Sequence, residues 1–490
     1  MTAEKRLDKL RDRKLFRSQC FIGGQWRDAD SGASIKVDNP ANGEIIGTVP
    51  RMGAAETRQA IDAAESAFRK WRAITAAERA DILYRWYQLM MEHQEDLGTI
   101  MTLEQGKPLA EAKGEIAYAA SFIKWFAEEA RRAYGDTIPA PKAGQHIVVI
   151  KQPVGVSAAI TPWNFPSSMI TRKAGAALAA GCTMVAKPAS ATPYSALALA
   201  ELGQRAGLPD GVLNIITGGA ADIADTLTGD ARVRKISFTG STEVGRKLMA
   251  NCSQHIQKVS LELGGNAPFI VFEDANLDKA VEGAMGSKFR NTGQTCVCVN
   301  RFLVHNDIHD AFVEKLQAAM GKLKVGDGFA DGVTQSALIN KSGAEKVQEH
   351  LDDALAKGAT LVCGGKPHPD GGSFVQPTLI TDVTPEMTLC GEETFGPLAA
   401  IMRFDSEDEA IEKANDTPYG LAAYFYSQDV HRCWRVGEAL EAGMVGINEG
   451  MISNAAAPFG GVKESGLGRE GSKYGIDEFM EVKYLCMGGA

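Results

Sequence analysis

The chain has 490 residues, enough for more than one domain with a full hydrophobic core. Its 61 acidic and 52 basic side chains give a net charge of −9. This balance argues against a nucleic-acid-binding protein, which needs a basic surface. No apolar run is long enough to cross a bilayer, and the acids near the N-terminus argue against an organellar transit peptide.

The cysteines indicate a reducing compartment. There are nine, an odd number, and apart from Cys296 and Cys298 they show no paired spacing. The histidines are equally scattered, so no Cys/His cluster has the spacing of metal ligands. We therefore expect a cytoplasmic protein without a structural metal.

The first third of the chain predicts short strands, then helices, then an extended arm. Residues 1–20 are expected to form a frayed surface helix, and residues 21–50 short strands and turns. Helices are predicted at Ala54–Trp71, Ala76–Met101 and Pro108–Ala133. The stretch 134–152 contains glycines, prolines and a β-branched run, and so predicts an arm that leaves the main body.

From residue 154 the chain alternates short apolar runs with helices, which predicts a parallel sheet covered on both faces. A second alternating series begins at Ala267, and we place the boundary between two α/β domains near Glu262–Gly265. The tail 473–490 reads as an edge strand that pairs with the arm, within one subunit or across two. Ligands of such sheets lie beyond the carboxyl ends of the strands.

Cys296 is the candidate nucleophile. It follows Asn291-Thr292-Gly293-Gln294-Thr295, residues that end a helix and leave backbone N–H groups free. A thiol nucleophile needs a low thiolate pKa, partial exposure and donors for the oxyanion it creates. An inert buried cysteine is the commoner fate of such a residue, and composition alone favours it.

Four further motifs place polar residues at predicted strand ends. Gly240-Ser241 leads into a helix whose N-terminus suits a pyrophosphate, although the middle glycine of the usual dinucleotide fingerprint is absent. Lys187 offers a cation, Asn164 an oxyanion donor and Glu262 a buried general base. Glu393 and Phe395 add a carboxylate for ribose hydroxyls and a ring for packing. Taken alone, the Gly240 motif is no better than even against an ordinary strand–helix turn, and a solvated lysine before a turn is the commoner explanation of Lys187.

Taken together and in this order, the motifs resemble those of the aldehyde dehydrogenase superfamily. The segments that carry the resemblance are Trp163-Asn164-Phe165-Pro166, Lys187-Pro188-Ala189-Ser190, Gly240-Ser241, Glu262-Leu263-Gly264-Gly265, Gly293-Gln294-Thr295-Cys296 and Glu393-Thr394-Phe395-Gly396-Pro397. Within the superfamily, Lys288-Phe289-Arg290-Asn291, Cys296-Val297-Cys298 and the run 465–475 resemble the succinate-semialdehyde dehydrogenases.

The resemblance implies a fold of two doubly wound α/β domains plus a small β oligomerisation arm. It assigns 1–133 and 153–262 to a dinucleotide-binding domain, 263–472 to a catalytic domain, and 134–152 with 473–490 to the arm. A homodimer or homotetramer is expected, with neither nucleic acid nor membrane as a partner.

The resemblance also implies the reaction and its residues. Cys296 is the nucleophile, Glu262 the general base that hydrolyses the thioester, and Asn164 the oxyanion donor. The cofactor is NADP, with NAD possible. The implied cofactor contacts are Trp163, Asn164, Lys187, Pro188, Ala189, Ser190, Gly240, Ser241, Leu263, Glu393 and Phe395.

Succinate semialdehyde is the implied substrate, because Arg172, Arg290 and Ser453 match family positions that hold its carboxylate. Glutarate semialdehyde is one methylene longer and is discriminated only modestly by such a site. A thiol esterase without cofactor and a catalytically silent relative are the alternatives of other classes. Cys296 and Cys298 are also a candidate redox pair that could form a disulfide. The alternative, given equal weight, is that Cys298 is only a small buried side chain.

Overall fold

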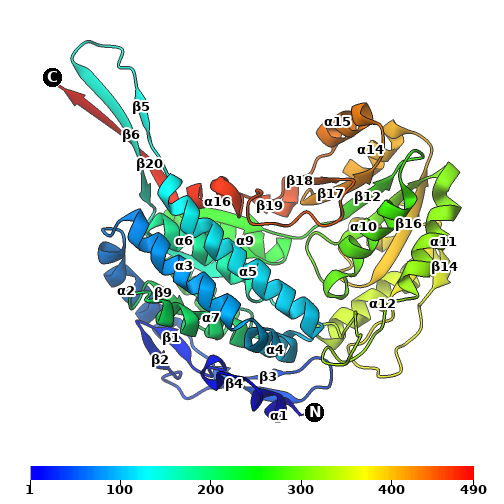
Figure 1. Ribbon diagram of the computed structural model, residues 1–490, viewed down its shortest axis with the longest axis horizontal. Helices are drawn as coiled ribbons and strands as arrows, with labels where there is room; N and C mark the ends of the chain where they lie inside the picture. The colour runs from blue at the N-terminus through cyan, green and yellow to red at the C-terminus, as the bar shows by residue number, and fades with distance from the viewer. Residues whose placement is uncertain (1, 490) are drawn as a thin grey trace.

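The computed structural model describes residues 2–489, so Met1 and Ala490 of the predicted domain ranges lie outside the described residues. An eight-stranded and a seven-stranded sheet, each with helices, form the body, and a three-stranded sheet projects from it (Figure 1). This arrangement confirms the predicted α/β class with a β arm. Within residues 2–489, no helix is long and apolar enough to cross a membrane.

The eight-stranded sheet has the order β19-β11-β10-β7-β8-β9-β1-β2. Its strands are β1 (Cys20–Ile22), β2 (Gln25–Arg27), β7 (Val156–Ile160), β8 (Thr183–Lys187), β9 (Leu213–Ile215), β10 (Val233–Thr239), β11 (Lys258–Glu262) and β19 (Gly466–Leu467). The five central strands are parallel, and the strands at both edges are antiparallel. The chain proceeds from β7 to β8 and β9 on one side, then returns to β10 and β11 on the other. Such a reversal creates a crevice at the carboxyl ends of the strands.

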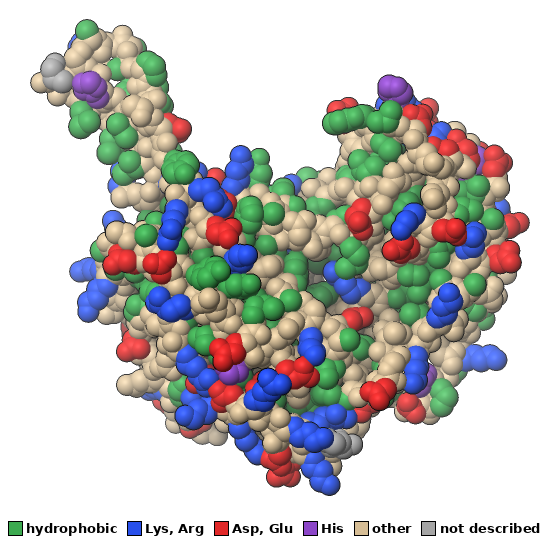
Figure 2. Space-filling view, in the orientation of Figure 1, with side chains coloured by type: hydrophobic (Ala, Val, Ile, Leu, Met, Phe, Trp, Pro, Cys, Tyr) green, Lys and Arg blue, Asp and Glu red, His purple; other side chains and the backbone are tan. Residues whose placement is uncertain are grey.

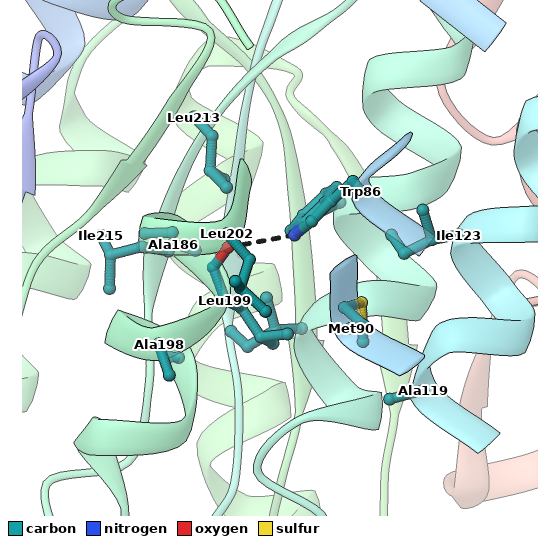
Figure 3. Close-up of a cluster of buried hydrophobic side chains, with 14 of the residues drawn as sticks. Trp86, Met90, Ala119, Ile123, Ala186, Ala198, Leu199, Leu202, Leu213 and Ile215 are labelled. Atoms are coloured by element: carbon teal, nitrogen blue, oxygen red, sulfur yellow. Dashed lines mark hydrogen bonds between the residues drawn. The ribbon is translucent and has the colours of Figure 1, made fainter. Parts of the chain in front are cut away.

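Helices cover both faces of this sheet. They are α2 (Ala54–Trp71), α8 (Ala220–Gly229) and α9 (Thr242–Cys252) on one face, and α6 (Ser168–Ala180) and α7 (Pro193–Ala206) on the other, with α3 (Ala76–Glu92), α4 (Gln94–Gln105) and α5 (Leu109–Glu129) outside them. Figure 3 shows the core between these layers, where Trp86 of α3 packs near Ile123 of α5 and donates its Nε1–H to the carbonyl of Leu199 at 3.1 Å. Burying each such apolar side chain contributes roughly 1.5–3 kcal/mol, which holds α3 and α5 against α7 and the sheet.

The seven-stranded sheet has the order β14-β15-β16-β13-β12-β17-β18, and all neighbours except β14 and β15 are parallel. Its elements are β12 (Ala267–Val271), α10 (Leu277–Phe289), β13 (Val299–His305), α11 (His309–Met320), α12 (Lys341–Ala356), β14 (Thr360–Cys363), β15 (Thr378–Thr381), β16 (Leu398–Phe404), α14 (Glu407–Asn415), β17 (Ala422–Tyr426), α15 (Val430–Ala439) and β18 (Met444–Ile447). The loop from α10 to β13 carries Cys296.

The projecting arm consists of β5 (Asp136–Ile138), β6 (Gln145–Pro153) and β20 (Met480–Gly488). β20 pairs antiparallel with β6 along its whole length, from Met480 opposite Pro153 to Gly488 opposite Gln145. The predicted pairing of tail and arm is therefore confirmed, and it occurs within one chain. β20 is an edge strand with exposed apolar side chains, and Figure 2 shows hydrophobic side chains along the arm.

Two predictions about single elements are wrong. Residues 76–101 do not form one helix, because the chain turns at His93 between α3 and α4. Residues 3–15 are not a frayed surface segment. α1 (Ala3–Leu7) and the turn at 13–15 bury Leu7 and Leu15, and the carboxylate of Asp96 accepts the N–H groups of Arg11 and Asp12.

Candidate active site

A cleft of about 200 Å³ lies beyond the carboxyl ends of β7, β10 and β11. It brings the predicted nucleophile together with most of the predicted cofactor residues. Its lining consists of Pro162, Trp163, Asn164, Thr239, Gly240, Ser241, Leu263, Gly264, Cys296, Glu393 and Phe395. The parallel topology brings together the lining residues that follow β7, β10 and β11, because these strands end at the same edge of one sheet, while Cys296, Glu393 and Phe395 come from loops of the seven-stranded sheet.

The loop that carries Cys296 is held in an unusual backbone conformation. Asn291 and Thr292 have φ values of 51° and 55°, in the left-handed region, and Gly293 has a φ of 77°. A Cβ atom on Gly293 would lie 2.4 Å from the carbonyl oxygen of Gly396, so glycine is required there. The loop thereby packs against the segment that carries Glu393 and Phe395.

Cys296 is half-buried, and its thiol is protonated in the resting protein. Burial raises the pKa of Cys296 to about 12, although the guanidinium of Arg172 acts in the opposite direction. The low thiolate pKa that a nucleophile needs is therefore absent from this state. A base or an added positive charge has to act on the sulfur when ligands bind.

Asn164 is fixed on both its side chain and its main chain. The side-chain Nδ2 donates to the carbonyl of Gln294 at 3.1 Å, which leaves its second hydrogen for another acceptor. The backbone carbonyl of Asn164 accepts from Nζ of Lys107 at 2.8 Å and from Nδ2 of Asn291 at 3.0 Å. An amide donor held this close to the nucleophile loop fits the predicted oxyanion donor.

Glu262 is the last residue of β11 and is only 2% exposed. Within residues 2–489, neither carboxylate oxygen has a hydrogen-bond partner. Burial, followed by the charge of Glu470, raises the pKa of Glu262 well above its usual range. A carboxyl group without partners and with a raised pKa has the properties of a general base that works near neutrality.

The predicted cofactor residues occupy two places. Gly240, Ser241 and Glu393 line the cleft, and Ser241 is the N-cap of α9, with its Oγ accepting from Val244 N–H. Lys187 lies at the end of β8 and is 4% exposed, with Ala189 and Ser190 half-buried just beyond it. These last residues are not part of the cleft lining, so the predicted contacts extend past it.

The residues present fit a dinucleotide. The N-terminus of α9 offers N–H groups to phosphate oxygens. Nζ of Lys187 donates to the carbonyl of Pro188 at 3.2 Å, and burial lowers the pKa of Lys187 to about 8. Burial also raises the pKa of Glu393 to about 8, while Gly265 N–H donates to it at 3.3 Å. The rings of Trp163 and Phe395 meet edge to face at 5.5 Å.

Arg172 is buried in an ion pair that the sequence did not predict. Its guanidinium donates to Glu470 at 3.2 Å and to the hydroxyl of Tyr118 at 2.8 Å, and it lies near the rings of Phe122 and Phe459. Its Nε, also buried, has no partner within residues 2–489. The guanidinium thus donates to Glu470 and Tyr118, and its Nε–H remains available for another acceptor.

The other two predicted substrate residues lie on separate elements. Arg290 directly follows α10 and is half-buried, with its guanidinium 5.2 Å from the centre of the Phe165 ring. Ser453 is half-buried in the loop after β18, and this loop approaches α10 where Met451 faces Gly286. Gly286 is one turn before Arg290, so the loop of Ser453 lies along the side of α10 from which Arg290 follows.

Four functional candidates were not predicted from the sequence: Lys107, Glu111, Glu115 and Glu470. Lys107, Glu115 and Glu470 are buried, and Glu111 is half-buried. Lys107 bonds to Asn164, Glu111 to Asn291 and Glu470 to Arg172, while Glu115 accepts from Ser167 and Ser168 directly after the motif of Asn164. Acids inside the otherwise apolar helix α5 were the available signal, since buried charges are costly unless they are paired.

Comparisons with known proteins show the family of the chain. A model described as the aldehyde dehydrogenase family matches residues 26–485. The chain is 64% identical over 480 residues to the succinate-semialdehyde dehydrogenase (NADP(+)) GabD of Escherichia coli, and 63% identical over 481 residues to a glutarate-semialdehyde dehydrogenase of Pseudomonas aeruginosa. Each match covers 98% of this chain and 100% of the relative. A crystal structure titled as an E. coli NADP-dependent enzyme superposes with a TM-score of 0.97 at 64% identity, covering 98% of this chain and 100% of that one. The chain belongs to the aldehyde dehydrogenase family.

Proposed function

We propose that this protein oxidises succinate semialdehyde to succinate with NADP as the electron acceptor. The observation that carries the proposal is the single cleft in which Cys296 and Asn164 adjoin the N-terminus of α9. The names of the E. coli and P. aeruginosa relatives support a short ω-oxo acid as the substrate. Glutarate semialdehyde is the second candidate, because one of these relatives carries that name.

The chemistry follows from the residue types in the cleft and from Glu262, which ends β11 directly before the lining residue Leu263 and is not itself part of the cleft lining. When ligands bind, the thiol of Cys296 gives up its proton to solvent, and the thiolate sulfur bonds to the aldehyde carbon. The π electrons of the C=O bond move to the oxygen, which becomes an oxyanion. The free hydrogen on Nδ2 of Asn164 and the N–H of Cys296 stabilise that charge. Loss of hydride from the former aldehyde carbon leaves a thioester. Water then attacks the thioester carbon, Glu262 takes a proton from the water, and the C–S bond breaks, which releases the carboxylic acid and the Cys296 thiolate.

Bound NADP supplies the acceptor for the hydride that leaves the thiohemiacetal carbon. Lys187 and Ser190 would hold its 2′-phosphate, and Gly240 and Ser241 the pyrophosphate at the start of α9. Glu393 would accept ribose hydroxyls. NAD is expected to bind the same residues with fewer contacts. Packing contacts to the rings of the cofactor would come from Trp163, Pro188, Ala189, Leu263 and Phe395.

The carboxylate of the substrate would bind Arg172, Arg290 and Ser453. Two guanidinium groups and a hydroxyl suit one carboxylate, with charge-assisted hydrogen bonds worth roughly 1.5–3 kcal/mol each. The distance from these residues to Cys296 would then select substrates by length. The free Nε of Arg172 and the position of the Ser453 loop beside α10 support this assignment.

A homodimer or homotetramer completes the proposal. β20 presents an open strand edge with the exposed side chains of Val482, Tyr484 and Met487, and exposed apolar edges of this kind pair with other chains. A cytoplasmic location remains our prediction. Light scattering in solution will measure the subunit number, and a monomeric protein would contradict this part of the proposal.

The decisive assay follows reduced-nicotinamide absorbance with a panel of aldehydes, ranked by kcat/KM. We expect succinate semialdehyde to rank first, and Cys296→Ala to abolish oxidation while NADP still binds. Ester cleavage without any cofactor reduction would instead indicate the esterase. Near-normal turnover of Cys296→Ala would remove this cysteine from its role.

A further inference from the structure

A buried polar network joins the loop of Asn164 to the nucleophile loop, and Asn291 is at its centre. Asn291 is 1% exposed. Its Nδ2 donates to the backbone carbonyl of Asn164 at 3.0 Å and to that of Gln294 at 3.2 Å. Its Oδ1 accepts from Gln105 at 3.1 Å, and its backbone N–H donates to Glu111 at 2.8 Å. These contacts explain how a non-glycine residue is kept in the left-handed region.

Lys107 makes the second contact to the same carbonyl. The residue lies just before α5 and is 2% exposed. Its Nζ donates to the backbone carbonyl of Asn164 at 2.8 Å and to Glu115 at 2.5 Å. The other oxygen of Glu115 accepts the N–H groups of Ser167 and Ser168, at the start of α6. One ion pair therefore fixes the peptide of Asn164 and the helix that follows it.

Such a pair is costly to build for stability alone. Two buried charges lose their hydration, and an apolar pair of similar volume is often as stable. An oxyanion donor, in contrast, has to be held within about 0.5 Å of its productive position. Two donors on the carbonyl of Asn164 supply this restraint, because they fix the main chain from which its side chain projects.

We propose that Lys107 is a positioning residue for the oxidation, which acts through the backbone carbonyl of Asn164 and holds its side-chain amide beside the sulfur of Cys296. Asn291 shares this role from the nucleophile loop. The inference rests on the oxyanion role given to Asn164 in the proposed function. Lys107 itself touches neither substrate nor cofactor in this assignment.

A double-mutant cycle tests the inference. Lys107→Met should lower kcat/KM at least about tenfold for both succinate semialdehyde and butanal, since every aldehyde forms the same oxyanion. The dissociation constant of NADP should stay within about twofold. In an Asn164→Ala background, Lys107→Met should lower kcat/KM by less than about twofold, because the side chain that Lys107 positions is gone. Equal fold losses in both backgrounds would overturn the inference.

The single variants separate this inference from the proposed function. If Asn164→Ala oxidises aldehydes at the wild-type rate, the oxyanion role fails and the inference with it. If Asn164→Ala is impaired but the cycle is additive, only the positioning role of Lys107 fails. If Lys107→Met does not fold, Asn291→Gly replaces it in the cycle, measured in the wild-type and the Asn164→Ala backgrounds. Glycine adopts the left-handed φ of this position and removes only the side-chain amide.

Lys235→Met is the matched control. Lys235 is also fully buried, donates to Ser260 at 2.6 Å and lies 3.2 Å from the Glu478 carboxylate. Its removal deletes a buried ammonium that makes no contact with Asn164. We expect a lower Tm with kcat/KM within about twofold of wild type. A tenfold loss in this control would show that deleting any buried lysine impairs activity, and the inference would fall.

Discussion

Glu262 and Glu470 are two buried acids in electrostatic contact, and only Glu470 has partners. Glu470 accepts hydrogen bonds from Arg172 and Lys173, whereas both oxygens of Glu262 have none within residues 2–489. Although burial opposes it, Lys173 and Arg172 hold the pKa of Glu470 below its usual range. Its charge then adds to burial in raising the pKa of Glu262. The two acids are therefore driven to opposite protonation states.

The first prediction concerns the pH dependence of turnover. Glu262 acts as a base only when ionised, and its raised pKa places this ionisation well above the ordinary range of a glutamate. Turnover should therefore decline as the pH falls through that raised pKa. Glu470→Gln removes a negative charge and frees two cations, so the pKa of Glu262 should fall and the acidic limb of kcat should shift to lower pH.

Steady-state kcat measured against pH in both proteins checks this prediction. Glu262→Gln should abolish the limb and give a burst of reduced cofactor without sustained turnover. A limb at the same pH in Glu470→Gln and wild type would show that the two acids are not coupled in catalysis.

The second prediction concerns cofactor choice. A glutamate at the position of Ser190 would accept ribose hydroxyls and would repel a 2′-phosphate. Here Ser190 can donate to the phosphate and Lys187 can neutralise it. NADP should be accepted at least as well as NAD, and Ser190→Glu should shift the ratio of kcat/KM values toward NAD. A wild-type protein with a strong preference for NAD would refute this assignment.

The position of Lys187 also leads to a prediction of how the preference for NADP over NAD changes with pH. Burial lowers its pKa to about 8, so the ammonium is present below pH 8 and is lost above it. The ratio of kcat/KM for NADP over NAD should therefore fall as the pH rises through about 8. The ratio should not change with pH in Lys187→Met, which carries no charge at any pH.

The sequence predicted the cleft because its motifs sit at strand ends. Asn164 and Gly240 follow β7 and β10, Glu262 ends β11, and the parallel arrangement of these strands brings those ends together. It could not predict the partner of Arg172, because Glu470 is 298 positions away and belongs to no neighbouring strand end.

The local sequence pattern also failed to predict the turn at His93, which divides the expected single helix in two. No proline or glycine marks the break between α3 and α4, and the apolar spacing continues across it. The two helices are separated by how each packs against α5 and α7, which is tertiary information. The N-terminal segment shows the same limit, since its burial depends on acceptors supplied by Glu44 and Asp96.

The third prediction concerns oxidation. Cys296 and Cys298 are both free thiols, and Cys298 is 7% exposed with its Sγ 3.5 Å from Nζ of Lys288. A disulfide across one residue is strained and easily reduced, and it requires this loop to rearrange. Mild peroxide should cause a loss of activity that a dithiol reverses and that is absent in Cys298→Ala. Equal sensitivity with and without Cys298 would instead indicate oxidation of Cys296 alone.

The last prediction concerns the substrate carboxylate. Arg172→Ala and Arg290→Ala should each lower kcat/KM for succinate semialdehyde at least about tenfold, or roughly 1.4 kcal/mol. Butanal, which has no carboxylate, should be affected far less. Arg290→Ala should show the cleaner selectivity, because Arg172 also neutralises Glu470 and its loss disturbs the site for every aldehyde.

Arg290→Lys is the informative control for this prediction. It keeps the charge but removes the planar fork that binds both carboxylate oxygens, so it should recover only part of the loss. The measurement is the ratio of kcat/KM for succinate semialdehyde over butanal in each variant. If both alanine variants lost activity equally on the charged and the uncharged aldehyde, the arginines would be structural and the assignment of a carboxylate site would fail.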